Sequence, residues 1–219
     1  MIITYIAGYV AALKGLCYTC VYWRHCLQHP VCEGDIQLDH PGYMREALRE
    51  AQKAYDLGEV PIGAVVVHSG EIIGRGHNLR EMLSDSSAHA EILAMREAAR
   101  HLGDWRLNGC VLYSTVEPCP MCAGALVQFR VGTLVYGAAD SKAGAVDSIM
   151  DVVREPRFNH RVEVMAGVLA DECAGIIRNF FRELREKNKT DKNGEMAELV
   201  EGARLEMCGA MWKPCSRKP

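Results

Sequence analysis

Two short segments hold residues that can bind a metal and move protons. The first is His89-Ala90-Glu91 and the second is Glu117-Pro118-Cys119-Pro120-Met121-Cys122. Cys119 and Cys122 are three residues apart at the start of an expected helix, so their side chains lie on one face of it. With His89 they make three ligands, which leaves the fourth position of a tetrahedral zinc open for water. We therefore predict one catalytic Zn²⁺ per chain, bound by His89, Cys119 and Cys122.

Such a site suits the hydrolytic removal of an amine. Zinc lowers the pKa of its bound water to about 7 and so supplies hydroxide at neutral pH. The reaction also needs a carboxyl group that is not a ligand, to carry protons to the ring and to the departing ammonia. Glu91 lies two residues after His89, within reach of the bound water, and we predict that it is this catalytic group. The positive end of the second helix favours thiolates at Cys119 and Cys122.

Neither segment is specific by itself. A lone Cys-x-x-Cys is often a redox pair or half of a structural zinc site, and His-Ala-Glu is a common tripeptide. Together, in this order and each at an expected helix start, they match the established signature of zinc-dependent deaminases that act on nucleobases.

The elements that must position these residues can be read from hydrophobic spacing. Apolar residues recur at helical intervals from Met44, and Gly58 is a stop signal. Ser69-Gly70 predicts a hairpin between two apolar runs, and Ser86 or Ser87 is expected to cap the helix that carries His89 and Glu91. The elements expected in the first half are a helix from 44, strands at 62–67 and 71–74, and a helix at 88–101.

The second half alternates between strands and helices. Alternation of this kind favours an α/β sheet with helices on both faces. The expected elements are strands at 110–116, 131–137 and 161–168, and helices at 119–130, 147–153 and 169–187.

The two ends of the chain differ from the part between them. We expect a deaminase domain at 44–187, a cysteine-rich extension of unknown role at 1–43 and a polar tail at 188–219. The apolar start lacks the basic segment of a signal peptide, which favours a dispensable extension upstream of Met44. This extension holds a cluster of possible ligands with irregular spacing: Cys17, Cys20, His25, Cys26, His29 and Cys32. Adventitious thiols are the favoured interpretation, and a second, structural zinc site is the alternative.

Further segments resemble the tRNA-specific adenosine deaminases, a family of the cytidine deaminase-like superfamily. The resemblance runs from about Met44 to Arg185 and leaves out both ends. It rests on Met44–Ala51, Val60–Val66, Gly76–Asn78, Asp140–Ala145, Asn159–Val164, Gly167–Cys173 and Phe180-Phe181-Arg182.

This resemblance implies a three-layer α/β/α domain around a five-stranded mixed sheet, a homodimer, and conversion of adenosine to inosine at the first anticodon (wobble) position of tRNA. It implies that Asn78 hydrogen-bonds the flipped base, that Ala90 helps line the pocket and that Asp140 contacts the RNA backbone. It adds Phe181 as a substrate-binding aromatic residue, for which packing in the core is the alternative. Asn78 as a turn residue and Asp140 as a loop acid or helix cap remain alternatives.

The chain departs from the family in three places near the expected pocket rim. Leu79-Arg80 replaces Arg-Pro, Asp85-Ser86-Ser87 lacks a proline, and Asp147 stands where glycine is common. The last helix also carries basic residues that could meet phosphates or form an ordinary solvated face with Glu183 and Glu186. They are Arg178, Arg182, Arg185, Lys187, Lys189 and Lys192.

Composition and charge limit how this protein could bind RNA and in which compartment it works. The net charge is -3 and the sequence pI is about 6.2, so RNA contact must come from a local patch. The sequence has no apolar run of about 18 residues, which argues against a membrane span. The ten cysteines in 219 residues favour metal-bound and free thiols in a reducing compartment, the cytoplasm. A free-base or nucleoside deaminase (for guanine, cytosine or cytidine) and a non-catalytic zinc-bearing RNA-binding subunit remain alternatives, although the presence of Glu91 counts against the second.

Overall fold

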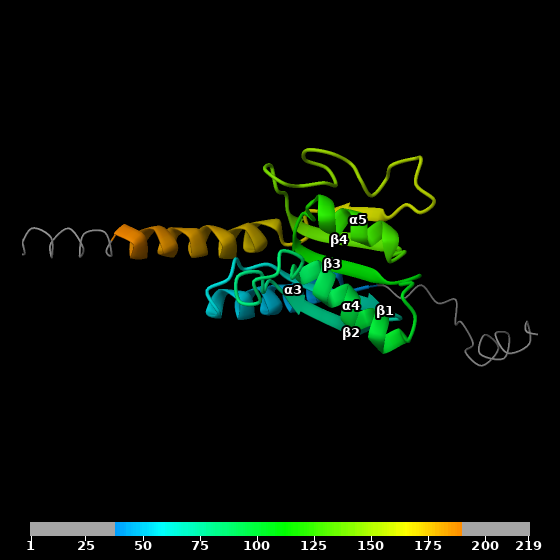
Figure 1. Cartoon of the computed structure of the whole chain (residues 1–219), viewed down its shortest axis with the longest axis horizontal. Helices are drawn as coiled ribbons and strands as arrows, with labels where there is room; N and C mark the ends of the chain where they lie inside the picture. Colours follow the sequence, from blue (N-terminus) through cyan, green and yellow to red (C-terminus); the bar gives the residue numbers. More distant parts are fainter. Residues whose placement is uncertain (1–37, 190–219) are drawn as a thin grey trace, which may run out of the picture. The chain divides into compact units, whose positions relative to one another are not determined.

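The computed structural model describes residues 38–189, which form a five-stranded mixed sheet covered by helices (Figure 1). The strand order is β2-β1-β3-β4-β5. β1 pairs antiparallel with β2 and β3, whereas β3–β4 and β4–β5 are parallel. The strands are β1 (Gly63–His68), β2 (Glu71–His77), β3 (Val111–Val116), β4 (Thr133–Ala138) and β5 (Glu163–Ala166).

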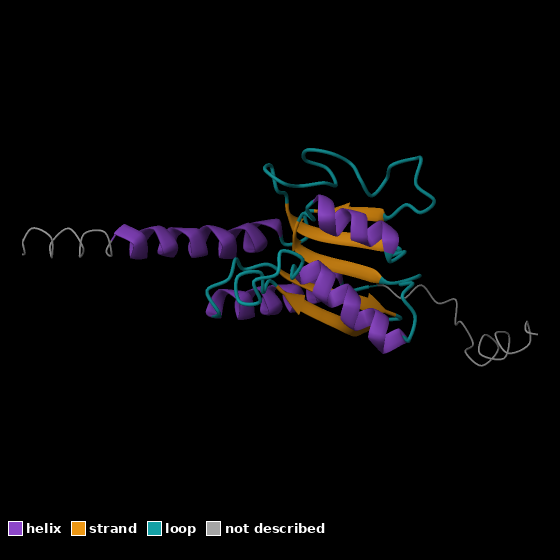
Figure 2. Cartoon of the chain, in the orientation of Figure 1, coloured by secondary structure: helices purple, strands orange, loops and turns teal. Residues whose placement is uncertain are grey.

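Helices cover both faces of this sheet, which confirms the expected three-layer α/β/α class (Figure 2). α4 (Ala90–Leu102) and α5 (Pro120–Gln128) pack on one face. α3 (His40–Asp56) packs on the other, together with the beginning of a further helix at residues 170–189.

The alternation of side chains along β1 separates the two cores. Ala64 and Val66 belong to the cluster under α4 and α5, whereas Val65 and Val67 belong to the cluster under α3. Successive residues of a strand point to opposite faces, so a continuous apolar run is what a strand buried on both faces requires. The helix and strand types expected between residues 44 and 187 are confirmed, with one exception given below.

Two local features place the start of α4 beside β2 and Asn78. The β1–β2 hairpin turns at Ser69 and Gly70, whose φ angles are 50° and 83°, as a two-residue type I′ loop requires. Gly76 on β2 then lies so close to α4 that a side chain there would collide with the carbonyl oxygen of Ala90. The missing side chain lets β2 and α4 pack backbone to backbone next to Asn78.

Three expectations about local structure were wrong. Residues 147–153 form turns and irregular chain, not a short helix. Neither Ser86 nor Ser87 caps α4, because Ser87 is hydrogen-bonded to Asp85 and the N-cap residue is His89. The helix expected from Met44 begins at His40.

Some predictions lie outside the described residues. They include the interpretations of 1–37, with the cysteine cluster, and of the tail beyond residue 189. Among the described residues, no helix is long and apolar enough to cross a bilayer.

Candidate metal centre and active site

The three predicted ligands meet at the ends of two helices. The ligand atoms of His89, Cys119 and Cys122 all lie within 4.8 Å of one another. His89 Nδ1 is 3.7 Å from Cys119 Sγ and 3.6 Å from Cys122 Sγ. Two segments that are about thirty residues apart in the sequence therefore form one potential metal site.

Local sequence explains this placement. His89 and Cys119 are the N-cap residues of α4 and α5, and both have extended backbones. Pro120 occupies the first turn of α5, where its fixed φ suits a helix start and its missing N–H costs nothing. Both helices thus direct unpaired N–H groups and the positive ends of their dipoles towards the ligands.

These three residues fit zinc in both chemistry and spacing. Zinc takes Cys sulfur at about 2.3 Å and His nitrogen at about 2.0–2.1 Å, so a tetrahedral site separates sulfur from nitrogen by about 3.5 Å. The two sulfur–nitrogen distances are 3.7 Å and 3.6 Å. A set of one imidazole and two thiols favours zinc over Mg²⁺ or Ca²⁺, which prefer oxygen ligands.

The electrostatics of the thiol pair favour a bound cation. Hydrogen bonds from Cys122 and His89 lower the pKa of Cys119 to about 4. The same contact raises the pKa of Cys122, and burial raises it further. The Cys119 contact also raises the pKa of His89. A cation bound between them would displace the thiol protons, because both sulfurs would ligate it as thiolates.

Glu91 lies beside the ligands on the first turn of α4. Only 4% of its surface is exposed, and burial raises the pKa of its carboxyl group. Electrostatic contact with Cys119 raises this pKa further, whereas contact with His89 opposes the shift. A carboxyl group with a raised pKa accepts and returns protons more readily near neutral pH, which suits a proton shuttle.

A cavity of about 140 Å³ opens onto this centre. Such a volume lies below the roughly 300–1,000 Å³ of sites for drug-sized ligands, so it suits a small ring. Cys122 lies fully buried behind the cavity. Six of the predicted site residues line it: Asn78, His89, Ala90, Glu91, Cys119 and Asp140.

Glu117 fastens one wall of this cavity. Its buried carboxylate accepts hydrogen bonds from the backbone N–H groups of Asp140, Val146, Asp147 and Ser148 at 2.8–3.1 Å, and from the Ser148 hydroxyl. Burial opposes ionisation, but these hydrogen bonds outweigh it and lower the pKa of Glu117 to about 2. The N–H of Val152, which a helix over 147–153 would direct to the carbonyl of Ser148, donates instead to that of Ala145, so the expected helix does not form.

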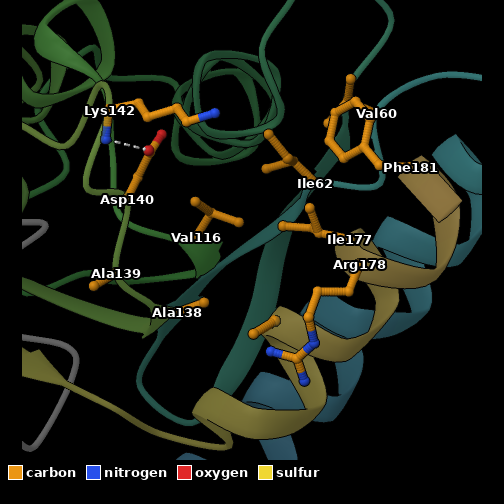
Figure 3. A pocket seen from close by; sticks show the side chains of 11 residues that line it. Val60, Ile62, Val116, Ala138, Ala139, Asp140, Lys142, Ile177, Arg178 and Phe181 are labelled. Carbon is orange, nitrogen blue, oxygen red and sulfur yellow. Dashed lines mark hydrogen bonds between the residues drawn. The ribbon is translucent and has the colours of Figure 1, made fainter. Parts of the chain in front are cut away.

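A second cavity, of about 470 Å³, adjoins the first and shares Ile62, Val116 and Asp140 with it (Figure 3). Phe181 lines this second cavity and not the metal pocket, and it is 39% exposed. Across it, Asp140 faces the helix that carries Phe181 and Arg178. The Asp140 carboxylate accepts from the N–H groups of Lys142 and Ala143, so it caps its own turn as well as bordering both cavities.

The departures from the family pattern have local explanations in part. Asp147 accepts hydrogen bonds from Tyr136 Oη at 2.6 Å and from Arg154 at 3.0 Å, which ties its loop to β4. The Asp85 carboxylate holds Ser87 by two bonds, so it closes the turn before His89 without a proline. Nothing in the structure explains Leu79.

Two carboxylates near the site carry contacts that sequence reasoning missed. Glu59 accepts a hydrogen bond from Asn78, and the five donors of Glu117 were not foreseen. The available signal was a charged residue inside an apolar context at each position, Glu59-Val60-Pro61 and Val116-Glu117-Pro118. Buried carboxylates are rare unless they are paired or hydrogen-bonded.

Comparison with known proteins agrees with this geometry. Residues 38–185 match the family model of the MafB19-like deaminases. A tRNA-specific adenosine deaminase of Bacillus subtilis is 57% identical over 147 residues, which are 67% of this chain and 91% of that protein. One of Streptococcus pyogenes serotype M1 is 48% identical over 151 residues, which are 69% and 88% of the two chains.

Solved structures give the same picture. One from a study of A-to-I editing by tRNA:A34 deaminases at the wobble position has a TM-score of 0.60 and 44% identity, covering 62% of this chain and 98% of that one. A guanine deaminase of Nitrosomonas europaea has a TM-score of 0.58 at 25% identity, covering 65% and 84%. The chain belongs to the deaminase family and, within it, to the tRNA-specific adenosine deaminases.

Proposed function

We propose that this protein hydrolyses adenosine to inosine and ammonia at the wobble position of tRNA, with Zn²⁺ bound by His89, Cys119 and Cys122. The main support is the meeting of these three ligand atoms within 4.8 Å, beside the buried Glu91 and at the base of a small cavity. Three ligands leave one position for water, and a catalytic zinc needs that open position.

The bound zinc would supply a water of lowered pKa and a positive charge to stabilise the adduct. Glu91 takes a proton from the attacking water and delivers it to ring nitrogen N1. It then passes a proton to the departing amine, so water adds at C6 and ammonia leaves. Burial raises the pKa of the Glu91 carboxyl group, which is the direction that suits a group holding a proton between two steps.

The cavities suit a flipped nucleotide with its neighbours outside. The 140 Å³ pocket would take the base, with Asn78 and Ala90 in its wall. The adjoining 470 Å³ cavity would take the adjacent RNA, with Asp140 near the backbone and Phe181 as a stacking surface. Lys142 and Arg178 on this cavity supply local positive charge to an acidic chain.

We also propose a homodimer in the cytoplasm. Support for the dimer comes from apolar side chains that are about half exposed in the segment between β4 and β5, namely Ile149, Met150 and Phe158, since exposed apolar surface often marks interfaces. The limits of the deaminase domain, 44–187, are likewise a proposal.

The decisive experiment is inosine formation in a transcribed tRNA with adenosine at the first anticodon position, run in parallel with free guanine, cytosine and cytidine. Guanine is included because a guanine deaminase of the same fold, from Nitrosomonas europaea, is 25% identical to this chain. We expect inosine at that position and no turnover of the free compounds. Ammonia from a free base without inosine would retain the zinc chemistry and overturn the tRNA substrate.

A further inference from the structure

A buried carboxylate contacts the pocket residue Asn78 from behind. Glu59 lies just after α3 and is 2% exposed, and Asn78 lies just after β2 and is 7% exposed. Asn78 Nδ2 donates to Glu59 Oε2 at 3.1 Å, and the backbone N–H of Met82 donates to Glu59 Oε1 at 2.7 Å. One carboxylate therefore binds both a residue of the pocket wall and the loop that follows it.

The hydrogen bond between Asn78 and Glu59 has a fixed donor and a fixed acceptor. An ionised carboxylate only accepts hydrogen bonds, whereas an asparagine side chain has a donor end and an acceptor end of nearly equal size. Shape alone would let the Asn78 amide face either way. The carboxylate permits only one orientation, with Nδ2 turned towards Glu59, because Oδ1 in that place would set two acceptors against each other in a buried site.

We propose that Glu59 is a positioning residue that sets the polarity of the Asn78 amide. Asn78 is thereby left with Oδ1 and its second N–H for the nucleoside, and the loop at 79–85 is fixed through Met82. This inference rests on the proposed function for its meaning, since the nucleoside is what the amide would recognise. An inverted amide would present a donor where the nucleoside needs an acceptor, and the reverse.

Glu59→Gln tests the orientation without a change of size. The backbone N–H of Met82 cannot turn round, so the introduced amide keeps its oxygen on Met82 and directs its NH₂ towards Asn78. Asn78 must then invert to accept. We expect a 10- to 100-fold loss of kcat/KM on the anticodon stem-loop, the loss expected when a charge-assisted hydrogen bond is replaced by a mismatched one.

A double-mutant cycle shows whether Glu59 acts through Asn78. If it does, Glu59→Gln in an Asn78→Ala background lowers kcat/KM by no more than about threefold beyond Asn78→Ala alone. Equal losses in both backgrounds would overturn the proposal, as would an unchanged kcat/KM for the single variant. The matched control is Glu81→Gln in the same loop, whose side chain is 78% exposed and which we expect to retain wild-type kinetics and melting temperature.

A spectroscopic readout separates this proposal from the assigned activity. In ¹⁵N-labelled wild-type protein, the Asn78 side-chain NH₂ signal, identified by its loss in Asn78→Ala, should show one proton shifted downfield by the carboxylate. Glu59→Gln should abolish that shift. Absence of the shift in the wild type would refute the geometry even if the variant failed to fold. A present shift in a protein that forms no inosine would overturn the proposed substrate and leave the amide orientation standing.

Discussion

Replacement of Glu117 by Gln should destabilise the protein more than its small change in shape suggests. The carboxylate accepts four backbone N–H groups and one hydroxyl from the loop at 140–148. An amide of the same size would turn an NH₂ group towards some of those donors. The substitution thus removes the charge and leaves buried donors without acceptors.

The magnitude follows from the pKa of this group, which the fold lowers from 4.5 to about 2. At about 1.4 kcal/mol per pH unit, the folded state favours the ionised form by about 3 kcal/mol. Solvent screens this charge little, because Glu117 is only 2% exposed. For a domain of about 150 residues, a loss of this size lowers the melting temperature by about 6–12 °C.

The contribution of Glu117 to the free energy of unfolding depends on pH. Because folding depresses the pKa of Glu117, its contribution is fully present above about pH 4.5 and is lost as the pH falls through about 2. The difference in unfolding free energy between wild type and Glu117→Gln should therefore shrink from about 3 kcal/mol at pH 7 to about 1 kcal/mol at pH 3. At the lower pH both proteins will have lost their metal, so they remain comparable.

Urea unfolding followed by circular dichroism at both pH values measures this difference, with the exposed Glu163→Gln as control. We also expect deamination to fall, because Asp140 and the turn before Cys119 lose their anchor. If Glu117→Gln unfolded within about 0.5 kcal/mol of the wild type at pH 7, the carboxylate would not be holding the loop, and our account of this wall would be wrong.

Three further predictions concern the centre and the RNA. Glu91→Ala should retain the metal but lose about 10²- to 10⁴-fold in turnover, the range for a general acid–base group; surviving turnover alongside full metal content would exclude Glu91 as the shuttle. Elemental analysis should give about one zinc per chain, lost on acidification because the thiolates protonate; a value near two would support a second site among the N-terminal cysteines. Phe181→Ala should raise KM for the stem-loop by about 10- to 100-fold, as loss of one stacking contact would, and an unchanged KM would remove Phe181 from the RNA surface.

The meeting of the three candidate metal ligands could be predicted from sequence because their geometry is local. His89 and Cys119 each sit at the start of a helix, and Cys122 follows one turn later. Once a sheet places the two helix starts side by side, the ligands meet with little further adjustment. The alternation of side chains along β1 and the turn at Ser69-Gly70 likewise depend on neighbours in the sequence, so the sheet could also be predicted.

The loops escaped prediction because distant residues determine their conformation. Spacing favoured a helix at 147–153, but Glu117, about thirty residues earlier, anchors the start of this segment, and the N–H of Val152 donates to Ala145 instead of Ser148. Ser87 has the chemistry of a helix cap, yet Asp85 takes its hydroxyl. In each case a competing hydrogen bond within the folded chain outweighed a local preference.

Two buried carboxylates thus hold the two loop walls of the pocket, Glu59 behind Asn78 and Glu117 behind Asp140. Glu59 accepts hydrogen bonds from two N–H groups, and Glu117 accepts them from four N–H groups and a hydroxyl. Since these donors belong to the protein, each carboxylate contributes to the chemistry by fixing what the ligand meets. Loops are ordinarily the most mobile part of a fold, and a pocket built from them would have to be ordered when the base enters. Because each loop is anchored to a buried charge, it becomes ordered when the protein folds and not when the base binds. Substitutions on the exposed rim, such as the family departure at Arg80, should therefore be tolerated far better than loss of either carboxylate.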